Sequence, residues 1–139
     1  MLLLGLDPGG QTGFALVQVE GNLVTLLSIG QFSEREKLPN LVAGAHRVIF
    51  ESFQIGPRSA AGTNLISLEV IGAIKSLCEL NSIPWISQTP SQRRFIQIRH
   101  PEWTKPFEGK THAVSHGGDA LMHVLTYCYH HLKVRKFQP

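Results

Sequence analysis

The chain has little of what defines several large protein classes. Of its 139 residues only two are cysteines, Cys78 and Cys128, and they form no Cys-x-x-Cys pair, which argues against a disulfide framework or a cysteine zinc site. No apolar run approaches the roughly 20 residues that a membrane-spanning helix needs. The opening MLLLGLD has no basic region before its apolar residues, so we do not expect a signal peptide. These absences predict a protein of a reducing cytoplasm.

Charged residues make up only 17% of the chain, and they are unevenly placed. Residues 1–83 contain five Lys and Arg and seven Asp and Glu. Residues 84–139 contain eight Lys and Arg and only three Asp and Glu. Six of the seven histidines also follow residue 99. A basic half is typical of proteins that bind a polyanion such as nucleic acid. The alternative is a solvated basic surface that favours solubility.

The length, with 42% hydrophobic residues, fits one folded domain over residues 1–139. Apolar patterning and turn residues predict strands at 2–7, 13–19, 23–32, 47–51 and 83–87. They predict helices at 34–46, 64–80, 90–97 and 113–133, with a loop at 52–63 and irregular structure at 98–112. The expected fold is an α/β mixed five-stranded sheet, with three antiparallel strands and then two parallel ones, flanked by helices.

Three acidic residues occupy positions where catalytic groups are often found. Asp7 ends the first predicted strand and Glu51 ends the fourth. Asp119 follows His116 by three residues in the last predicted helix, so these two side chains share a helix face. If the first and fourth strands are neighbours, a helix packed over their ends brings all four residues together.

Clustered carboxylates repel one another unless a cation neutralises them. Oxygen ligands favour Mg²⁺ or Mn²⁺, and an imidazole among them favours Mn²⁺ modestly. Two such ions suit phosphodiester hydrolysis, because one activates water and the other stabilises the leaving oxygen. Gly117 and Gly118, which are costly inside a helix, indicate close approach of another backbone or a ligand. The simpler alternatives are that Asp7 initiates a turn and that Asp119 only complements a helix N-terminus.

These segments resemble the RuvC-like branch of the RNase H fold, the Holliday-junction resolvases. The matching segments, in the family's order, are LLLGLDPGGQTGFALV, VIFES, TPSQRR and SHGGDALMHVLTY. The resemblance spans nearly the whole chain and implies a homodimeric endonuclease that nicks four-way DNA junctions with two divalent ions in each site. By matching positions, it implies a catalytic and metal-binding set made of Asp7, Glu51, His116 and Asp119. Phage-encoded relatives are often compact, so we expect a bacterial or phage-infected cell as the setting.

The same resemblance suggests residues that contact DNA. The family has an aromatic residue shortly after the catalytic Glu, and Phe53 follows Glu51 by two residues. We also expect nearby basic side chains to hold DNA phosphates: Arg58, Arg93, Arg94, Arg99, Lys105 and Lys110. Two symmetric cuts need two sites, so the wide apolar surface of helix 64–80 is expected to form a two-fold contact. The alternative is a helix buried within one subunit.

Other functions fit parts of the pattern. An RNase H-like nuclease that acts on RNA or on other branched DNA would need the same metals. A non-cleaving junction-binding module would keep the fold but lose the catalytic set. An actin-like ATPase or sugar-kinase lobe also begins with Asp-x-Gly, but its nucleotide cleft needs two lobes. A chain of 139 residues allows one lobe, so neither a nucleotide cofactor nor a membrane partner is expected.

Overall fold

The computed structural model describes residues 1–53, 63–108 and 115–139. Its centre is a six-stranded mixed sheet in the order β5-β4-β1-β2-β3-β6. The strands are β1 (Leu2–Asp7), β2 (Thr12–Glu20), β3 (Leu23–Phe32), β4 (Arg47–Glu51), β5 (Trp85–Gln88) and β6 (Lys136–Gln138). The helices are α1 (Leu38–Ala43), α2 (Thr63–Leu80), α3 (Arg94–Arg99), α4 (Pro101–Thr104) and α5 (Ser115–His131), with 3-10 turns η1 (Arg35–Lys37) and η2 (Lys105–Phe107).

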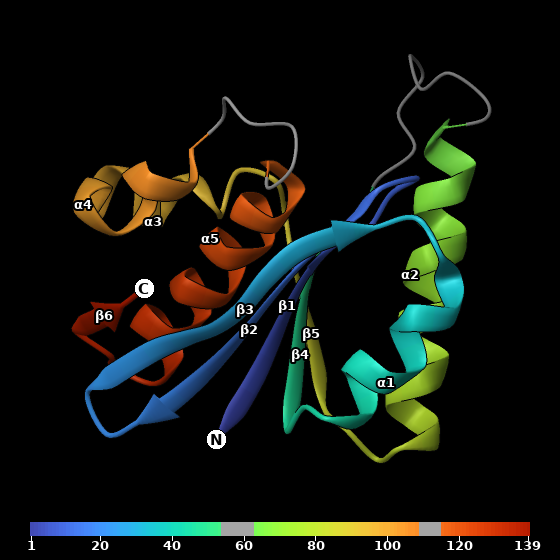
Figure 1. The fold of residues 1–139 in the computed structure, drawn as a ribbon, viewed down its shortest axis with the longest axis horizontal. Helices are drawn as coiled ribbons and strands as arrows, with labels where there is room; N and C mark the ends of the chain where they lie inside the picture. The colour runs from blue at the N-terminus through green and yellow to red at the C-terminus, as the bar shows by residue number, and fades with distance from the viewer. Residues whose placement is uncertain (54–62, 109–114) are drawn as a thin grey trace.

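Helices cover both faces of the sheet and give the molecule three layers (Figure 1). The helices α3, α4 and α5 lie on one face, and α1 and α2 lie on the other. Each face has its own buried apolar cluster, the first containing Leu3 and Ile49 and the second Leu4 and Phe50. Successive side chains of a strand point to opposite faces, so β1 and β4 contribute to both clusters. Burial on both faces explains their continuous apolar runs.

The order of the strands confirms the expected mixed sheet. β1, β2 and β3 form an antiparallel meander, and β4 and β5 add in parallel on the other side of β1. The parallel register pairs Leu6 with Phe50. The next residues, Asp7 and Glu51, are the last residues of these two adjacent strands. They therefore lie side by side at the same end of the sheet.

The sixth strand was not expected. The residues of β6 pair in parallel with the start of β3, and Phe137 contacts the rings of Trp103 and Phe107. Three residues in a basic tail have too little periodicity to be recognised as a strand. The sheet therefore has six strands, one more than the five expected, and the additional strand lies at its edge.

Several helix predictions also need correction. The segment expected to be irregular, 98–112, contains α4 and η2, because Pro101 and Pro106 stand in first turns, where proline is tolerated. The helix expected at 90–97 begins at Arg94, since Pro90 lies in a turn closed by the Gln92 amide on the Thr89 carbonyl.

The remaining helices lie close to their expected places. The helix expected at 34–46 is η1 followed by α1, and those expected at 64–80 and 113–133 are α2 and α5. Among the described residues, no helix is long and apolar enough to cross a membrane.

Candidate metal centre

Strand alternation turns Asp7 and Glu51 toward α5. Leu3 and Ile49 lie in the apolar cluster beneath α5, and the two carboxylates lie an even number of residues further along the same strands. Both strands end at the end of the molecule where α5 begins (Figure 1). The two residues therefore reach the same helix from adjacent strands.

Glycines allow the first turns of α5 to lie directly against the sheet. A Cβ on Gly13 would overlap the carbonyl group of His116. A Cβ on Gly117 would lie 2.8 Å from the Gly30 carbonyl oxygen, and one on Gly118 would meet the backbone of η2. The expectation that this glycine pair marks a close backbone approach is confirmed. The approach holds His116 and Asp119 over the strand ends.

Asp7, His116 and Asp119 converge at this point. Each offers one ligand atom, and these three atoms all lie within 4.8 Å of one another. The Nδ1 atom of His116 is 3.0 Å from Oδ2 of Asp7. Asp7 is buried, whereas His116 and Asp119 are partly exposed. Asp7 therefore lies at the buried end of the group, and His116 and Asp119 lie at the end that is open to solvent.

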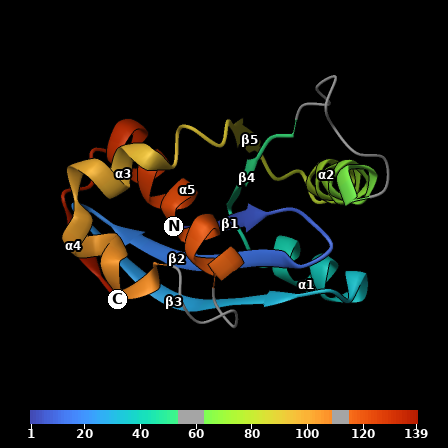
Figure 2. The ribbon, with the colours of Figure 1, turned by 90° about the horizontal axis from the view of Figure 1, so that it is seen from above.

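Glu51 lies beside this group and contacts two basic side chains. Nη1 of Arg93 is 3.0 Å from Oε1 of Glu51 and 3.2 Å from Oδ2 of Asp119. The helix α3 lies next to α5 (Figure 2), and Arg93, the residue before α3, contacts both carboxylates. Buried His123 places Nε2 3.4 Å from the same Glu51 oxygen.

Burial and charge shift the carboxyl groups in different directions. Burial raises the pKa of Asp7, and a hydrogen bond and repulsion from Glu51 raise it further, to about 9. Burial also raises the pKa of Asp119, although Arg93 opposes the rise. Burial would raise the pKa of Glu51, but its contacts with His123, Asp7 and Arg93 outweigh that effect and lower it to about 2.

The donor set fits a divalent cation. Asp7 and Asp119 supply hard oxygen ligands and His116 supplies one nitrogen, a combination suited to Mg²⁺ or Mn²⁺. The raised pKa of both aspartates shows that their negative charge is poorly stabilised by the protein alone. A bound cation would stabilise that charge.

The residues expected to contact DNA have different surroundings. Arg93 contacts carboxylates, whereas Arg94 and Lys105 are exposed to solvent. The Nε atom of Arg99 donates a hydrogen bond to the Tyr129 hydroxyl at 3.3 Å. Two further candidates, Arg58 and Lys110, lie outside the described residues.

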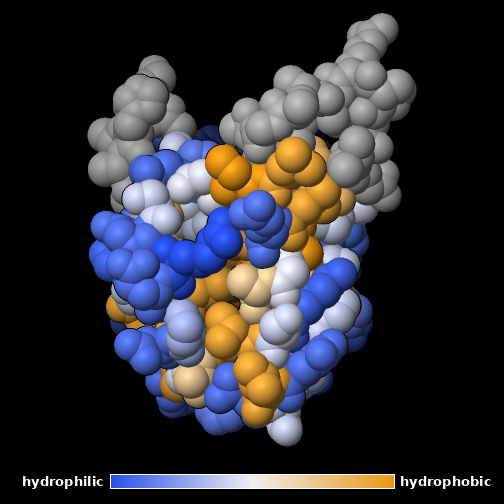
Figure 3. All heavy atoms as spheres, turned by 90° about the vertical axis from the view of Figure 1, so that its right-hand side faces the viewer, coloured by the Kyte–Doolittle hydropathy of each residue, from blue (hydrophilic) through white to orange (hydrophobic). Residues whose placement is uncertain are grey.

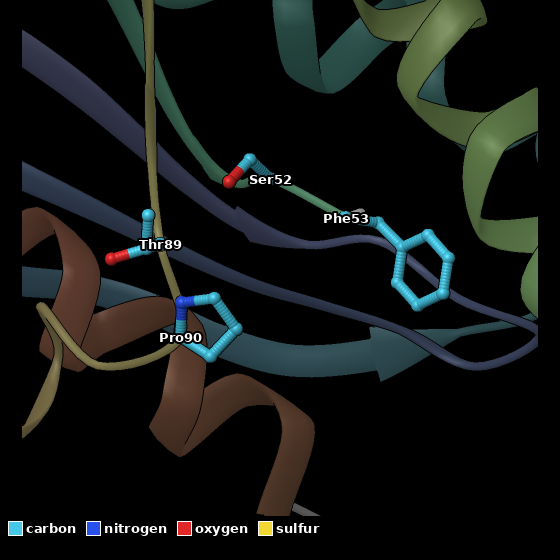
Figure 4. Close-up of a pocket in the computed structure, with 4 residues that line it drawn as sticks. All are labelled: Ser52, Phe53, Thr89 and Pro90. Carbon is cyan, nitrogen blue, oxygen red and sulfur yellow. The ribbon is translucent and has the colours of Figure 1, made fainter. Parts of the chain in front are cut away.

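Two hollows flank the strand ends. One, of about 280 Å³, lies between the segments that follow β4 and β5 and is lined by Ser52, Phe53, Thr89 and Pro90 (Figure 4). The half-buried ring of Phe53 points toward α2 and packs against the apolar cluster that contains Leu4. A second hollow, of about 340 Å³, is lined by Gln97, Phe107, Glu108, Ser115, Asp119 and Met122.

Two residues of the site were missed in the sequence. His123 lies four residues after Asp119 on the same face of α5, so helical spacing could have identified it. Gln88 is the register partner of Glu51 across β4 and β5, and its Oε1 lies 2.7 Å from Nδ1 of His123. Gln88 depends on the strand register, which the sequence does not specify by itself.

No family model matches the sequence, and no curated protein matches it. Among solved structures, Thermus thermophilus RuvC gives a TM-score of 0.71 at 20% identity, covering 96% of this chain and 98% of that one. T. thermophilus RuvC in complex with Holliday junction substrate gives 0.72 at 18% identity, covering 96% of each chain. At this level of identity the likeness establishes the fold. The chain therefore has the fold of RuvC, and the resemblance first carried by its motifs extends over its whole architecture.

Proposed function

We propose that the protein is a structure-selective endonuclease that cuts four-way DNA junctions by metal-dependent phosphodiester hydrolysis. The observation that carries this proposal is the convergence of Asp7, His116 and Asp119 at the strand ends of a RuvC fold. The neighbouring RuvC structure was solved with Holliday junction substrate, which makes a four-way junction the first substrate to test.

A divalent ion held by Asp7, His116 and Asp119 would supply Lewis acidity and an activated water. The protein's own groups prepare that site. Asp7 is protonated at neutral pH without metal, so it must release a proton when it becomes a ligand. Glu51 stays ionised and is oriented by Arg93 and His123, so it is suited to orient an attacking water.

The surface around the site supports the binding of a branched polyanion. Arg94, Arg99 and Lys105 add positive charge in the elements next to α5, and Arg58 and Lys110 belong to the same proposed phosphate-binding set. Phe53, two residues beyond Glu51, is proposed to contact bases where the strands of the junction separate.

A two-fold dimer would provide two sites for two cuts. The face formed by α2 and the edge strand β5 exposes Leu65, Ile66, Leu80 and Trp85 at 52%, 39%, 82% and 37%. Figure 3 shows apolar side chains gathered on this side of the molecule. We propose this face, named here the α2 face, as the contact between two copies.

The function is tested with end-labelled four-way junction, linear duplex DNA and RNA, each with Mg²⁺, Mn²⁺ or a chelator. We expect paired nicks in the junction with either metal, little cutting of duplex or RNA, and no cutting with chelator. Preferred cutting of RNA would favour the RNA-processing alternative. Tight junction binding without nicks under any metal condition would favour the non-cleaving module.

Matched variants identify the site in the same assay. Asp7→Asn and Glu51→Gln change almost no volume, and each should abolish cutting while leaving junction affinity largely intact. Glu36→Gln, an exposed change on η1 outside the α2 face, is the control and should cut like the unaltered protein. Full cutting by Asp7→Asn would contradict the proposed site.

A further inference from the structure

Arg93 lies between two of the four carboxylate and imidazole side chains expected to bind metal. A single nitrogen, Nη1, contacts Glu51 from the end of β4 at 3.0 Å and Asp119 from α5 at 3.2 Å. The side chains of Arg93, Glu51 and Asp119 are 28%, 14% and 32% exposed, so solvent only partly screens the two ion pairs. A fixed positive charge therefore lies inside the acidic site.

The remaining ligands form a group without Glu51. Within the part of the chain that the structure describes, the one group of three metal-ligating side chains is Asp7, His116 and Asp119. The Oε1 atom of Glu51 already faces Arg93 at 3.0 Å and Nε2 of His123 at 3.4 Å. Glu51 is thus held by nitrogen atoms of Arg93 and His123 and by a hydrogen bond with Asp7. Asp7, His116 and Asp119 form the group that can share one cation.

We propose that the site holds one divalent ion, bound by Asp7, His116 and Asp119, and that Arg93 supplies the second positive charge. This inference rests on the proposed function and replaces the expectation of two ions in each site. A second ion bound by Glu51 would lie next to the guanidinium, whose Nη1 contacts both Glu51 and Asp119. Two cations so close together would repel each other strongly.

The same placement gives Arg93 a role toward DNA. A guanidinium carries five N–H donors, and among the described residues both of its ion pairs are made by Nη1. Nη2 and Nε therefore remain for an oxygen of a phosphodiester at the site. A donor fixed where negative charge develops stabilises the transition state without rearranging. Arg93 thus differs from Arg94 and Lys105, whose exposed charges suit the flanking backbone.

The proposal is tested by counting bound Mn²⁺ per chain, without DNA, by calorimetric titration and by electron paramagnetic resonance of free Mn²⁺. We expect one ion in the unaltered protein. Arg93→Gln removes the internal cation and should allow a second ion, whereas Arg93→Lys keeps the charge and should stay at one. Arg94→Gln, which removes the adjacent exposed arginine, is the matched control and should also stay at one.

A second comparison separates ligands from neighbours. Asp7→Asn should weaken Mn²⁺ binding by at least about tenfold, because it removes a ligand. Glu51→Gln should retain one bound ion with an affinity within about threefold, a smaller loss than ligand or supporting groups usually cause. Two ions in the unaltered protein, or loss of an ion in Glu51→Gln, would overturn the proposal and leave the proposed function standing. An absence of any bound ion would contradict both.

Discussion

At the scale of single residues, Asp7 links the stability of the protein to its metal site. Its carboxyl group is buried beside Glu51, and its pKa is raised to about 9. In the unfolded chain the same group ionises near pH 3.8. The folded, metal-free protein therefore binds a proton at neutral pH that the unfolded chain does not, and binding of a cation would release it.

The pH dependence of stability follows from these values. Because the folded state binds more protons, Asp7 lowers the free energy of unfolding as pH rises from about 4 to about 9. Glu51 changes the free energy of unfolding in the opposite direction, because its pKa is lowered to about 2. The stability that Glu51 contributes is fully present above about pH 5. Urea denaturation with chelator present should show maximal stability near pH 5 and a decline toward pH 9.

The variant Asp7→Asn tests whether Asp7 causes the decline of stability toward pH 9. It should flatten the decline in stability and raise the free energy of unfolding at pH 8 by roughly 1–3 kcal/mol, because the neutral amide does not have to take up a proton when the chain folds. The exposed control Glu79→Gln should leave the decline unchanged. An unchanged slope in Asp7→Asn would show that another group controls it.

The sequence predicted the positions of the acidic residues better than it predicted their partners. Asp7 and Glu51 end recognisable strands, and the spacing of His116 and Asp119 places them on one helix face, so local patterns were sufficient. The contacts of Arg93 with Glu51 and Asp119 depend on how α3 lies against α5, a tertiary feature with no local signal. Gln88 was missed for the same reason, because its position beside Glu51 also depends on tertiary packing.

At the scale of elements, the close packing of α5 on the sheet sets the geometry of the site. Gly13 on β2 leaves room for the backbone of α5 at His116, and Gly117 on α5 leaves room for the backbone of β3 at Gly30. Elsewhere the fit is looser, since a Cβ on Gly72 of α2 would meet no atom within 4 Å. Glycine therefore has a steric role in β2 and in the first turn of α5 that it lacks at Gly72 in α2.

Gly13→Ala should damage both the fold and the site. The new methyl group would overlap the His116 carbonyl, and since a helix backbone cannot shift easily, we expect a loss of roughly 1–3 kcal/mol in urea denaturation. Junction cutting should fall with it, because His116 moves. Gly72→Ala is the control and should gain up to about 1 kcal/mol from its higher helix propensity. Equal stability of the two variants would contradict this role for Gly13.

The elements missed in the sequence were those with the weakest local patterns. β6 is a three-residue strand, and the prolines of α4 and η2 suggested an irregular segment although both stand in first turns. The longer elements were predicted because buried strands and amphipathic helices repeat their patterns over many residues. Tertiary contacts, such as those of Phe137 with Trp103 and Phe107, fix the short ones.

At the scale of the whole molecule, the uneven charge predicts how DNA affinity depends on salt. Each lysine or arginine that contacts a phosphate releases counterions and steepens the decline of affinity with salt. Arg94→Gln and Lys105→Gln should each reduce the salt slope of junction binding by about one. Arg35→Gln removes an arginine paired with Glu69 and should leave the slope unchanged. Unchanged slopes in all three variants would remove these residues from the DNA interface.

The α2 face predicts the oligomeric state. Ile66→Glu places a charge on that face without entering the core and should convert a dimer into a monomer in sedimentation equilibrium. Ile98→Glu is the matched control, since Ile98 is 81% exposed on α3 across the sheet, and it should remain dimeric. A monomer in the unaltered protein, with and without junction DNA, would exclude this contact.

The proposed metal site is tested by locating the bound cation, through its anomalous scattering, in a crystal of the protein soaked in Mn²⁺. We expect one strong peak at about 2.0–2.3 Å from a carboxylate oxygen of Asp7, a carboxylate oxygen of Asp119 and a ring nitrogen of His116. A peak elsewhere on the molecule, with these three side chains bound only to protein or water, would contradict the proposed metal site.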